Sequence, residues 1–117
     1  MEDRRKLKRR YLMFYSRIFD RRNGALIGYL SDITTEGMMV ISEVPLEKDI
    51  VHRFRMDLPE DIFGKGHMDF EALCVWNRQD VNPNFYISGF ELKDLNDTDK
   101  NVIERIIDSY GFRERQI

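Results

Sequence analysis

The sequence contains little cysteine and histidine and no long apolar run. Its 117 residues include one cysteine, Cys74, and two histidines. A single thiol cannot form an internal disulfide and supplies at most one ligand to a metal ion, so we expect neither a disulfide scaffold nor a cysteine-based metal site. No apolar run approaches the roughly 20 residues of a membrane-spanning helix, and no apolar segment follows the basic N-terminus as in a signal peptide. We therefore expect a soluble, cytoplasmic protein without membrane insertion.

Catalytic and metal-binding motifs are also missing from the sequence. His52 and His67 lie far apart, and neither has a second ligand at a metal-binding spacing. The Gly-x-Ser-x-Gly, phosphate-loop and dinucleotide-binding patterns do not occur. His52 falls on the apolar face of an expected strand, which favours a satisfied core or rim histidine. Trp76 could stack on a base, but it alternates with Phe70 and Cys74, which favours a place in the core. The sequence predicts no enzyme, no metal and no cofactor.

The overall charge argues against a general affinity for polyanions. Lys and Arg number 19 and Asp and Glu number 21, which gives a net charge of -2. A protein with this balance has no overall attraction for a nucleic acid polymer or an anionic membrane. Anion binding must therefore depend on a local cluster of basic side chains.

The length fits one domain over residues 1–117, without an internal repeat or a linker.

A local cluster of basic side chains occurs at the N-terminus. Residues 4–10, Arg-Arg-Lys-Leu-Lys-Arg-Arg, are basic at every position but one. A run of like charges repels itself and usually remains a solvated arm until an anion neutralises it. Residues 1–10 are therefore predicted to form a basic arm that binds an anionic partner. A surface tail without a specific ligand is the alternative.

The central part of the chain, residues 11–92, is predicted to be all-β. Short runs of aromatic and β-branched residues alternate with turn residues, among them the strong hairpin signal Asn23-Gly24. Strands are expected over residues 11–19, 25–33, 38–42, 50–58, 68–77 and 85–92. Gly89, inside the last of these, suggests a bend or a bulge. Six strands joined mostly by short turns favour a closed six-stranded antiparallel barrel, because closure removes exposed sheet edges.

The C-terminal part changes from strand to helix periodicity. Apolar residues recur at helical spacing at Val102, Ile103, Ile106, Ile107 and Tyr110. Either Asn96 or Asp97 can cap the N-terminus of this helix, and Gly111 stands where a C-cap glycine is common. The pattern predicts a helix over residues 96–110 whose single apolar stripe packs on the mouth or the side of the barrel.

A short polar connection lies between the second and third expected strands. Residues 32–37, Asp-Ile-Thr-Thr-Glu-Gly, offer a carboxylate, two hydroxyls and a glycine. Gly37 permits a positive φ or the close approach of a ligand to the backbone. The segment is therefore a candidate binding loop, although an ordinary hairpin connection uses the same residue types.

Together these two segments resemble the PilZ domain, a bacterial receptor for the dinucleotide messenger cyclic di-GMP. That family carries an Arg-Arg-x-x-x-Arg segment just before its first strand and an [Asp/Asn]-x-Ser-x-x-Gly motif downstream. Here the first is Arg4-Arg5-Lys6-Leu7-Lys8-Arg9 and the second is Asp32-Ile33-Thr34-Thr35-Glu36-Gly37. The order of the motifs, their separation by one hairpin, and the pattern of six strands and a helix extend the resemblance over the whole chain.

The resemblance implies a set of ligand contacts. Arg4, Arg5 and Arg9 would contact phosphates and guanine edges, because a guanidinium group can donate bidentately to guanine O6 and N7. Asp32 would accept hydrogen bonds from guanine N1 and N2, and Thr34, which replaces the family's serine, would bind phosphate. Gly37 would leave room for the ligand. In a shifted register of the basic segment, Arg10 takes the place of Arg9.

The resemblance also implies how a signal is passed on. Binding of cyclic di-GMP would fold the arm over the barrel and change the surface that an effector protein meets. The motility, secretion and adhesion machineries of bacteria are the partner classes that it suggests, and the sequence leaves the oligomeric state open. The alternative is a PilZ-like protein-protein interaction module that binds no nucleotide.

Overall fold

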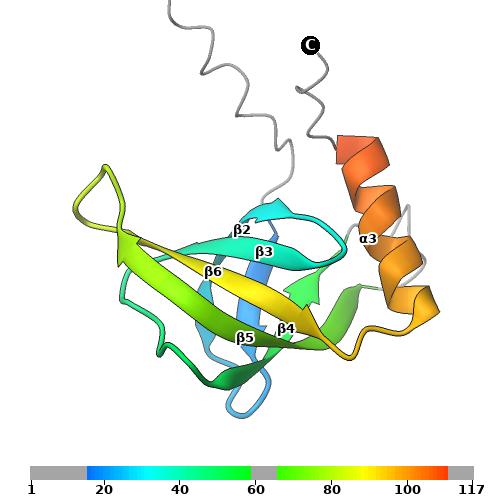
Figure 1. Ribbon diagram of the computed structural model, residues 1–117, viewed down its shortest axis with the longest axis horizontal. Coiled ribbons are helices and arrows are strands. Elements are labelled where there is room, and N and C mark those ends of the chain that lie inside the picture. Colours follow the sequence, from blue (N-terminus) through cyan, green and yellow to red (C-terminus); the bar gives the residue numbers. More distant parts are fainter. Residues whose placement is uncertain (1–15, 59–65, 111–117) are drawn as a thin grey trace, which may run out of the picture.

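The computed structural model describes residues 16–58 and 66–110 and shows a closed barrel with a helix at one end (Figure 1). The strands are β1 (Arg17–Asp20), β2 (Leu26–Ile33), β3 (Gly37–Ser42), β4 (Val51–Asp57), β5 (His67–Gln79) and β6 (Tyr86–Lys93), and the helix is α3 (Asp97–Tyr110). Neighbouring strands are antiparallel in the order β1-β2-β3-β6-β5-β4, and β4 closes on β1. The predicted six-stranded antiparallel barrel with a C-terminal helix is confirmed.

Most strand boundaries lie within one or two residues of the sequence-based expectation, and the starts of β1 and β5 illustrate the differences. The first strand was expected over residues 11–19, and β1 begins only at Arg17; residues 11–15 lie outside the described residues, as does the basic arm, residues 1–10. His67 was expected in a loop, but it is the first residue of β5 and pairs with Asp57 of β4. Ladder pairing with β4 therefore extends β5 further than its apolar pattern indicates.

The β1–β2 hairpin turns at Asn23-Gly24, as predicted. Gly24 has a φ of 75°, a value that suits glycine, and its N–H donates to Asp20 O at 2.7 Å. The Asn23 side-chain oxygen accepts the N–H of Ala25 at 2.9 Å. The Asp20 carboxylate is largely buried and pairs with Arg22 at 2.9 Å, and this hydrogen bond lowers the pKa of Asp20 below its ordinary value.

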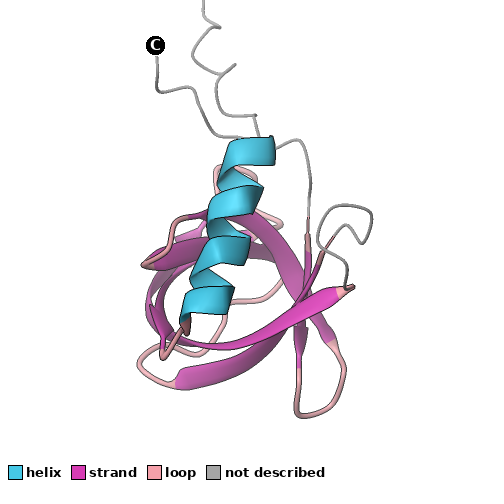
Figure 2. Cartoon of the chain, turned by 90° about the vertical axis from the view of Figure 1, so that its right-hand side faces the viewer, coloured by secondary structure: helices cyan, strands magenta, loops and turns pink. Residues whose placement is uncertain are grey.

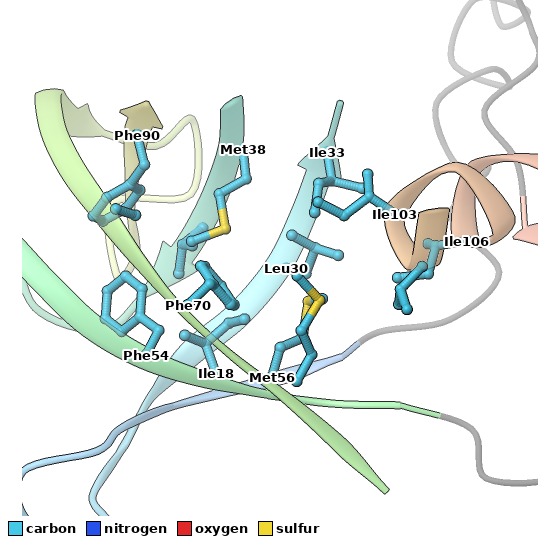
Figure 3. Close-up of a cluster of buried hydrophobic side chains, with 14 of the residues drawn as sticks. Ile18, Leu30, Ile33, Met38, Phe54, Met56, Phe70, Phe90, Ile103 and Ile106 are labelled. Atoms are coloured by element: carbon cyan, nitrogen blue, oxygen red, sulfur yellow. The ribbon is translucent and has the colours of Figure 1, made fainter. Parts of the chain in front are cut away.

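The core fills the barrel with inward-facing side chains from all six strands (Figure 3). Three phenylalanine rings pack edge to face at its centre, with Phe54 6.1 Å from Phe70 and 5.3 Å from Phe90 between ring centroids. His52 stacks on Phe54, and its Nε2 lies 2.8 Å from Glu47 O, which confirms the prediction of a satisfied rim histidine. Burial raises the pKa of the Cys74 thiol, as expected of a core cysteine.

Helix α3 lies across one open end of the barrel (Figure 2). Its buried residues Val102, Ile103 and Ile106 belong to the same apolar cluster as the barrel interior, and Figure 3 places Ile103 beside Ile33 of β2. The side-chain oxygen of Asn96 accepts the N–H of Asp99 at 2.7 Å, so Asn96 is the N-cap. The helix therefore closes the core at this end instead of adding a separate layer.

Replacing Asn96 by alanine is expected to lower the free energy of unfolding by about 1 kcal/mol, because the helix loses the acceptor for an unpaired N–H. Denaturant unfolding followed by circular dichroism measures this change. Asn96→Asp, which keeps an acceptor oxygen, is the control and should retain most of the stability. Equal stability of the alanine variant and the wild-type protein would contradict the assigned cap.

Candidate functional site

The β2–β3 connection is held in shape by Thr34. Its hydroxyl oxygen accepts the N–H groups of Glu36 and Gly37, both at 3.1 Å, and its own N–H donates to Gly37 O at 2.8 Å. The hydroxyl also lies 3.4 Å from Gly37 O, a long hydrogen bond. The threonine predicted to bind phosphate therefore already organises the turn that carries it.

Gly37 has a structural role that the sequence did not reveal. A Cβ atom at this position would lie 2.8 Å from Phe90 O on the neighbouring strand β6, so the close approach is made by the protein's own backbone. The φ of Gly37 is not positive. Within the described residues, Gly24 is the glycine with a positive φ. Of the two roles considered for this glycine, the positive φ is wrong, and the room for a ligand remains a prediction.

Asp32 faces outward because β2 contains a bulge. Leu30 is buried and pairs with Val40, whereas Asp32, two residues further on, is exposed and pairs with Met39. Regular alternation would give Leu30 and Asp32 the same face, so the extra residue, Ser31, reverses the pattern. Asp32 Oδ1 accepts the N–H of Ile33 at 2.9 Å.

A second bulge, in β5, turns Trp76 to the outside of the barrel. Cys74 is buried and pairs with Phe90, and the ladder then shifts so that Trp76 pairs with Gly89. The prediction that Trp76 shares the inward face of Cys74 is therefore wrong, because Val75 is an extra residue in the ladder. The bulge suggested by Gly89 is real, but it lies in the strand opposite that glycine.

The two bulges bring Asp32 and Trp76 into one row across the outside of the barrel. Asp32 pairs with Met39, Met39 with Gly89 and Gly89 with Trp76, on the neighbouring strands β2, β3, β6 and β5 (Figure 1). Three strand spacings of about 4.8 Å place the two ends of the row about 14 Å apart. Gly89 is needed in this row, because a Cβ there would collide with the indole ring of Trp76.

A cleft of about 210 Å³ follows this row. Its lining includes Asp32, Thr34 and Gly37 from the β2–β3 connection together with Met39 and Trp76. The structure thus brings together three predicted site residues and adds an aromatic side chain that sequence reasoning assigned to the core. The four predicted arginines, Arg4, Arg5, Arg9 and Arg10, lie outside the described residues.

The β1, β4 and β5 strands carry a different outer surface, made of cross-strand ion pairs. Arg55 contacts Asp69 at 3.0 Å, and Arg17 contacts Asp57 at 2.7 Å. The hydrogen bond from Arg55 lowers the pKa of Asp69 below its ordinary value. These mutually neutralised pairs offer little to a charged ligand, which leaves the cleft as the better candidate.

Two further features bear on the kind of site. Within residues 16–58 and 66–110, no three His, Cys, Asp or Glu side chains are grouped so that they could hold a metal ion. The described residues also include no helix with the length and apolar character needed to cross a membrane.

Solved structures with the same fold include those of three bacterial proteins. The PilZ domain of YcgR from Escherichia coli, solved with c-di-GMP, is 17% identical, with a TM-score of 0.60 over 87% of this chain and 82% of that one. The inhibitor of motility MotI/DgrA of Bacillus subtilis is 14% identical, with a TM-score of 0.63 over 81% of this chain and 46% of that one. MrkH of K. pneumonia in its apo state is 18% identical, with a TM-score of 0.61 over 82% of this chain and 45% of that one.

The chain thus spans less than half the length of MotI and of MrkH. No curated protein shows significant similarity to it. The model of the PilZ domain family matches residues 3–109, which include both the basic segment and the Asp32–Gly37 connection. This match covers most of the sequence and agrees with the observed barrel and helix. The chain therefore belongs to the PilZ domain family.

Proposed function

We propose that this chain is a receptor for cyclic di-GMP and that the ligand binds over the cleft between Asp32 and Trp76. The observation that carries the proposal is the outward row of Asp32, Met39, Gly89 and Trp76, which places a carboxylate and an aromatic ring at opposite ends of one cleft. The YcgR domain, which shares this fold, was solved with c-di-GMP.

One end of the row suits the hydrogen-bonding edge of a guanine base, and the other end suits its flat face. The Asp32 carboxylate can accept the N1 and N2 hydrogens of guanine, which form a parallel pair of donors. The indole of Trp76 can stack on a base plane, an interaction worth about 1–3 kcal/mol per base. Met39 lies between them and supplies apolar contact.

The phosphates of the ligand require cations from another part of the chain. No Lys or Arg lines the described cleft. We propose that Arg4, Arg5 and Arg9 of the basic arm supply them, with Arg10 as the alternative to Arg9. This assignment rests on the family's arginine segment and on the charge of the ligand, which carries two phosphate anions.

Thr34 can contribute one donor to a phosphate. Its oxygen accepts two backbone N–H groups, and its hydroxyl hydrogen points toward Gly37 O over a long 3.4 Å contact. Redirecting this hydrogen to a phosphate oxygen would cost little, because the bond it leaves is weak. We propose that the turn stays intact while the hydroxyl turns to the ligand.

The receptor would pass its signal by contact with an effector protein in the cytoplasm, without catalysis. Ordering of the arm over the cleft would change the surface next to β2 and β3, and a partner would recognise that change. A motility protein is one class of partner to test first, because a structure of the same fold is described as an inhibitor of motility.

Isothermal titration calorimetry of the wild-type protein with cyclic di-GMP tests the proposal. Cyclic di-AMP is the matched control ligand, because it has the same ring and phosphates but lacks the N1 and N2 hydrogens that Asp32 would accept. We expect binding of cyclic di-GMP at least about tenfold tighter than binding of cyclic di-AMP, since unpaired polar groups in a site penalise the wrong ligand. Absence of heat with cyclic di-GMP would favour the nucleotide-independent interaction module.

A further inference from the structure

Trp76 is in contact with a cation from its own strand. The guanidinium carbon of Arg78 lies 4.9 Å from the centroid of the indole ring, within the range of a cation–π interaction. The two residues face outward together, because Trp76 pairs with Gly89 and Arg78 pairs with Ile87 on β6. The arginine therefore reaches back along β5 to cover part of the ring.

The contact with a ring is not special to Arg78, because the guanidinium carbon of Arg17 also lies 5.4 Å from the centroid of Phe19. The difference between Arg78 and its neighbours on the barrel is the carboxylate partner. Five arginines form ion pairs with carboxylates: Arg17, Arg21, Arg22, Arg53 and Arg55. Over the described ranges 16–58 and 66–110, Arg78 forms no such pair. Its contact with the indole therefore does not compete with a carboxylate for the guanidinium group.

The indole is consequently held from two directions. The backbone of Gly89 lies against its Nε1, Cε2 and Cζ2 atoms, so closely that a Cβ would not fit. Arg78 covers the ring but is not part of the cleft lining, whereas Trp76 is. The cleft therefore meets a part of the indole that Arg78 leaves uncovered.

We propose that Arg78 is a positioning residue that fixes the indole of Trp76 as a preformed wall of the cleft. The proposal rests on the proposed function, because the wall matters for affinity only if a base packs against the part of the indole that Arg78 leaves uncovered. A free tryptophan side chain has two rotatable bonds, and a ligand that stacks on it must also immobilise it. The cation removes that cost before the ligand arrives, which is preorganisation of the site.

The experiment uses the fluorescence of Trp76, the single tryptophan of the chain. Arg78→Ala removes the cation and the stem, Arg78→Met keeps an aliphatic stem without charge, and Arg78→Lys keeps a cation. Arg53→Ala is the control, because Arg53 is exposed on β4 and pairs with Glu71 at 3.7 Å, away from the cleft lining. Acrylamide quenching of the free protein and the affinity for cyclic di-GMP are measured for each variant.

The alanine and methionine variants should be quenched more easily than the wild type, and their affinity for cyclic di-GMP should fall about two- to fivefold. Arg78→Lys should bind within about twofold of the wild type, and Arg53→Ala should match it. Unchanged quenching and affinity in the alanine variant would overturn the proposal, and so would wild-type behaviour of Arg78→Met. Absence of binding by the wild-type protein would overturn the proposed function itself. It would also remove the role of Arg78 in affinity.

Discussion

Replacing Asp32 by alanine is expected to weaken cyclic di-GMP binding at least about 100-fold, because two hydrogen bonds from guanine to a charged acceptor are lost at once. The fold should persist. Asp32 is exposed on the outside of β2, and substitutions of exposed side chains usually change stability little, so we expect the free energy of unfolding to change by less than about 1 kcal/mol. Calorimetric titration and thermal unfolding measure the two quantities on the same sample.

Two variants sharpen this test. Asp32→Asn keeps the size of the side chain and one acceptor oxygen, but it loses the charge and adds donors that oppose those of guanine, so we expect a loss of at least about tenfold. Asp108→Ala removes an exposed carboxylate from α3 and should bind like the wild type. Wild-type affinity of the Asp32→Ala protein would remove Asp32 from the binding site.

The basic arm can be tested on the same ligand. A variant with both Arg5→Ala and Arg9→Ala should lose binding to a similar extent. Its melting temperature should stay near that of the wild type if the arm is solvated as the sequence predicts, because a solvated arm contributes little to the core. Comparing Arg9→Ala with Arg10→Ala determines the register, since the larger loss identifies the base reader. If the double variant bound as tightly as the wild type, the phosphates would have to be neutralised by other residues.

Replacing Gly28 by alanine is expected to lower the free energy of unfolding by about 3 kcal/mol. Gly28 is buried in β2, and a Cβ there would collide with the carbonyl oxygen of Ile41 and lie 3.1 Å from Ser42 Cβ on β3. The obstacle is backbone, so relief requires β2 and β3 to separate and their ladder to distort. Denaturant unfolding measures the loss.

Gly24→Ala is the matched control for this substitution. Gly24 has a φ of 75°, but no atom lies within 4 Å of the position that a Cβ would occupy. Alanine at this position should lower the free energy of unfolding by only about 1 kcal/mol, the cost of the left-handed backbone conformation. A Gly24 variant that is less stable than the Gly28 variant would show that the collision with Ile41 does not determine the stability of β2.

The sequence predicted the barrel well wherever the strands are regular. In β4 the alternation of Phe54 and Met56 with exposed Arg53 and Arg55 is the one seen in the structure. The same reasoning failed at Trp76, because a bulge breaks the period of two and no residue type identifies its position from the sequence. The one usable signal was Gly89, which indicated an irregularity nearby but not the strand that contains it.

The candidate site was predictable only in part for a similar reason. Turn chemistry identified the Asp32–Gly37 connection, since Asp, Thr and Gly act there through local hydrogen bonds. The position of Trp76 depends on a bulge in the pairing of β5 with the next strand, β6. The contact of Gly37 with Phe90 depends on the pairing of β3 with β6, which is far from β3 in the sequence. Pairing between such distant strands is a property of the whole fold, so local patterns could not show it.

The bulges at Ser31 and Val75 affect how this chain should be aligned with other members of its family. A relative that lacks the extra residue would carry the outward-facing side chain one position earlier, opposite the same partner on the adjacent strand. A gap of one residue at either place would therefore preserve the three-dimensional equivalence of the aspartate and the tryptophan. An ungapped alignment would instead match a surface side chain of one protein with an interior side chain of the other.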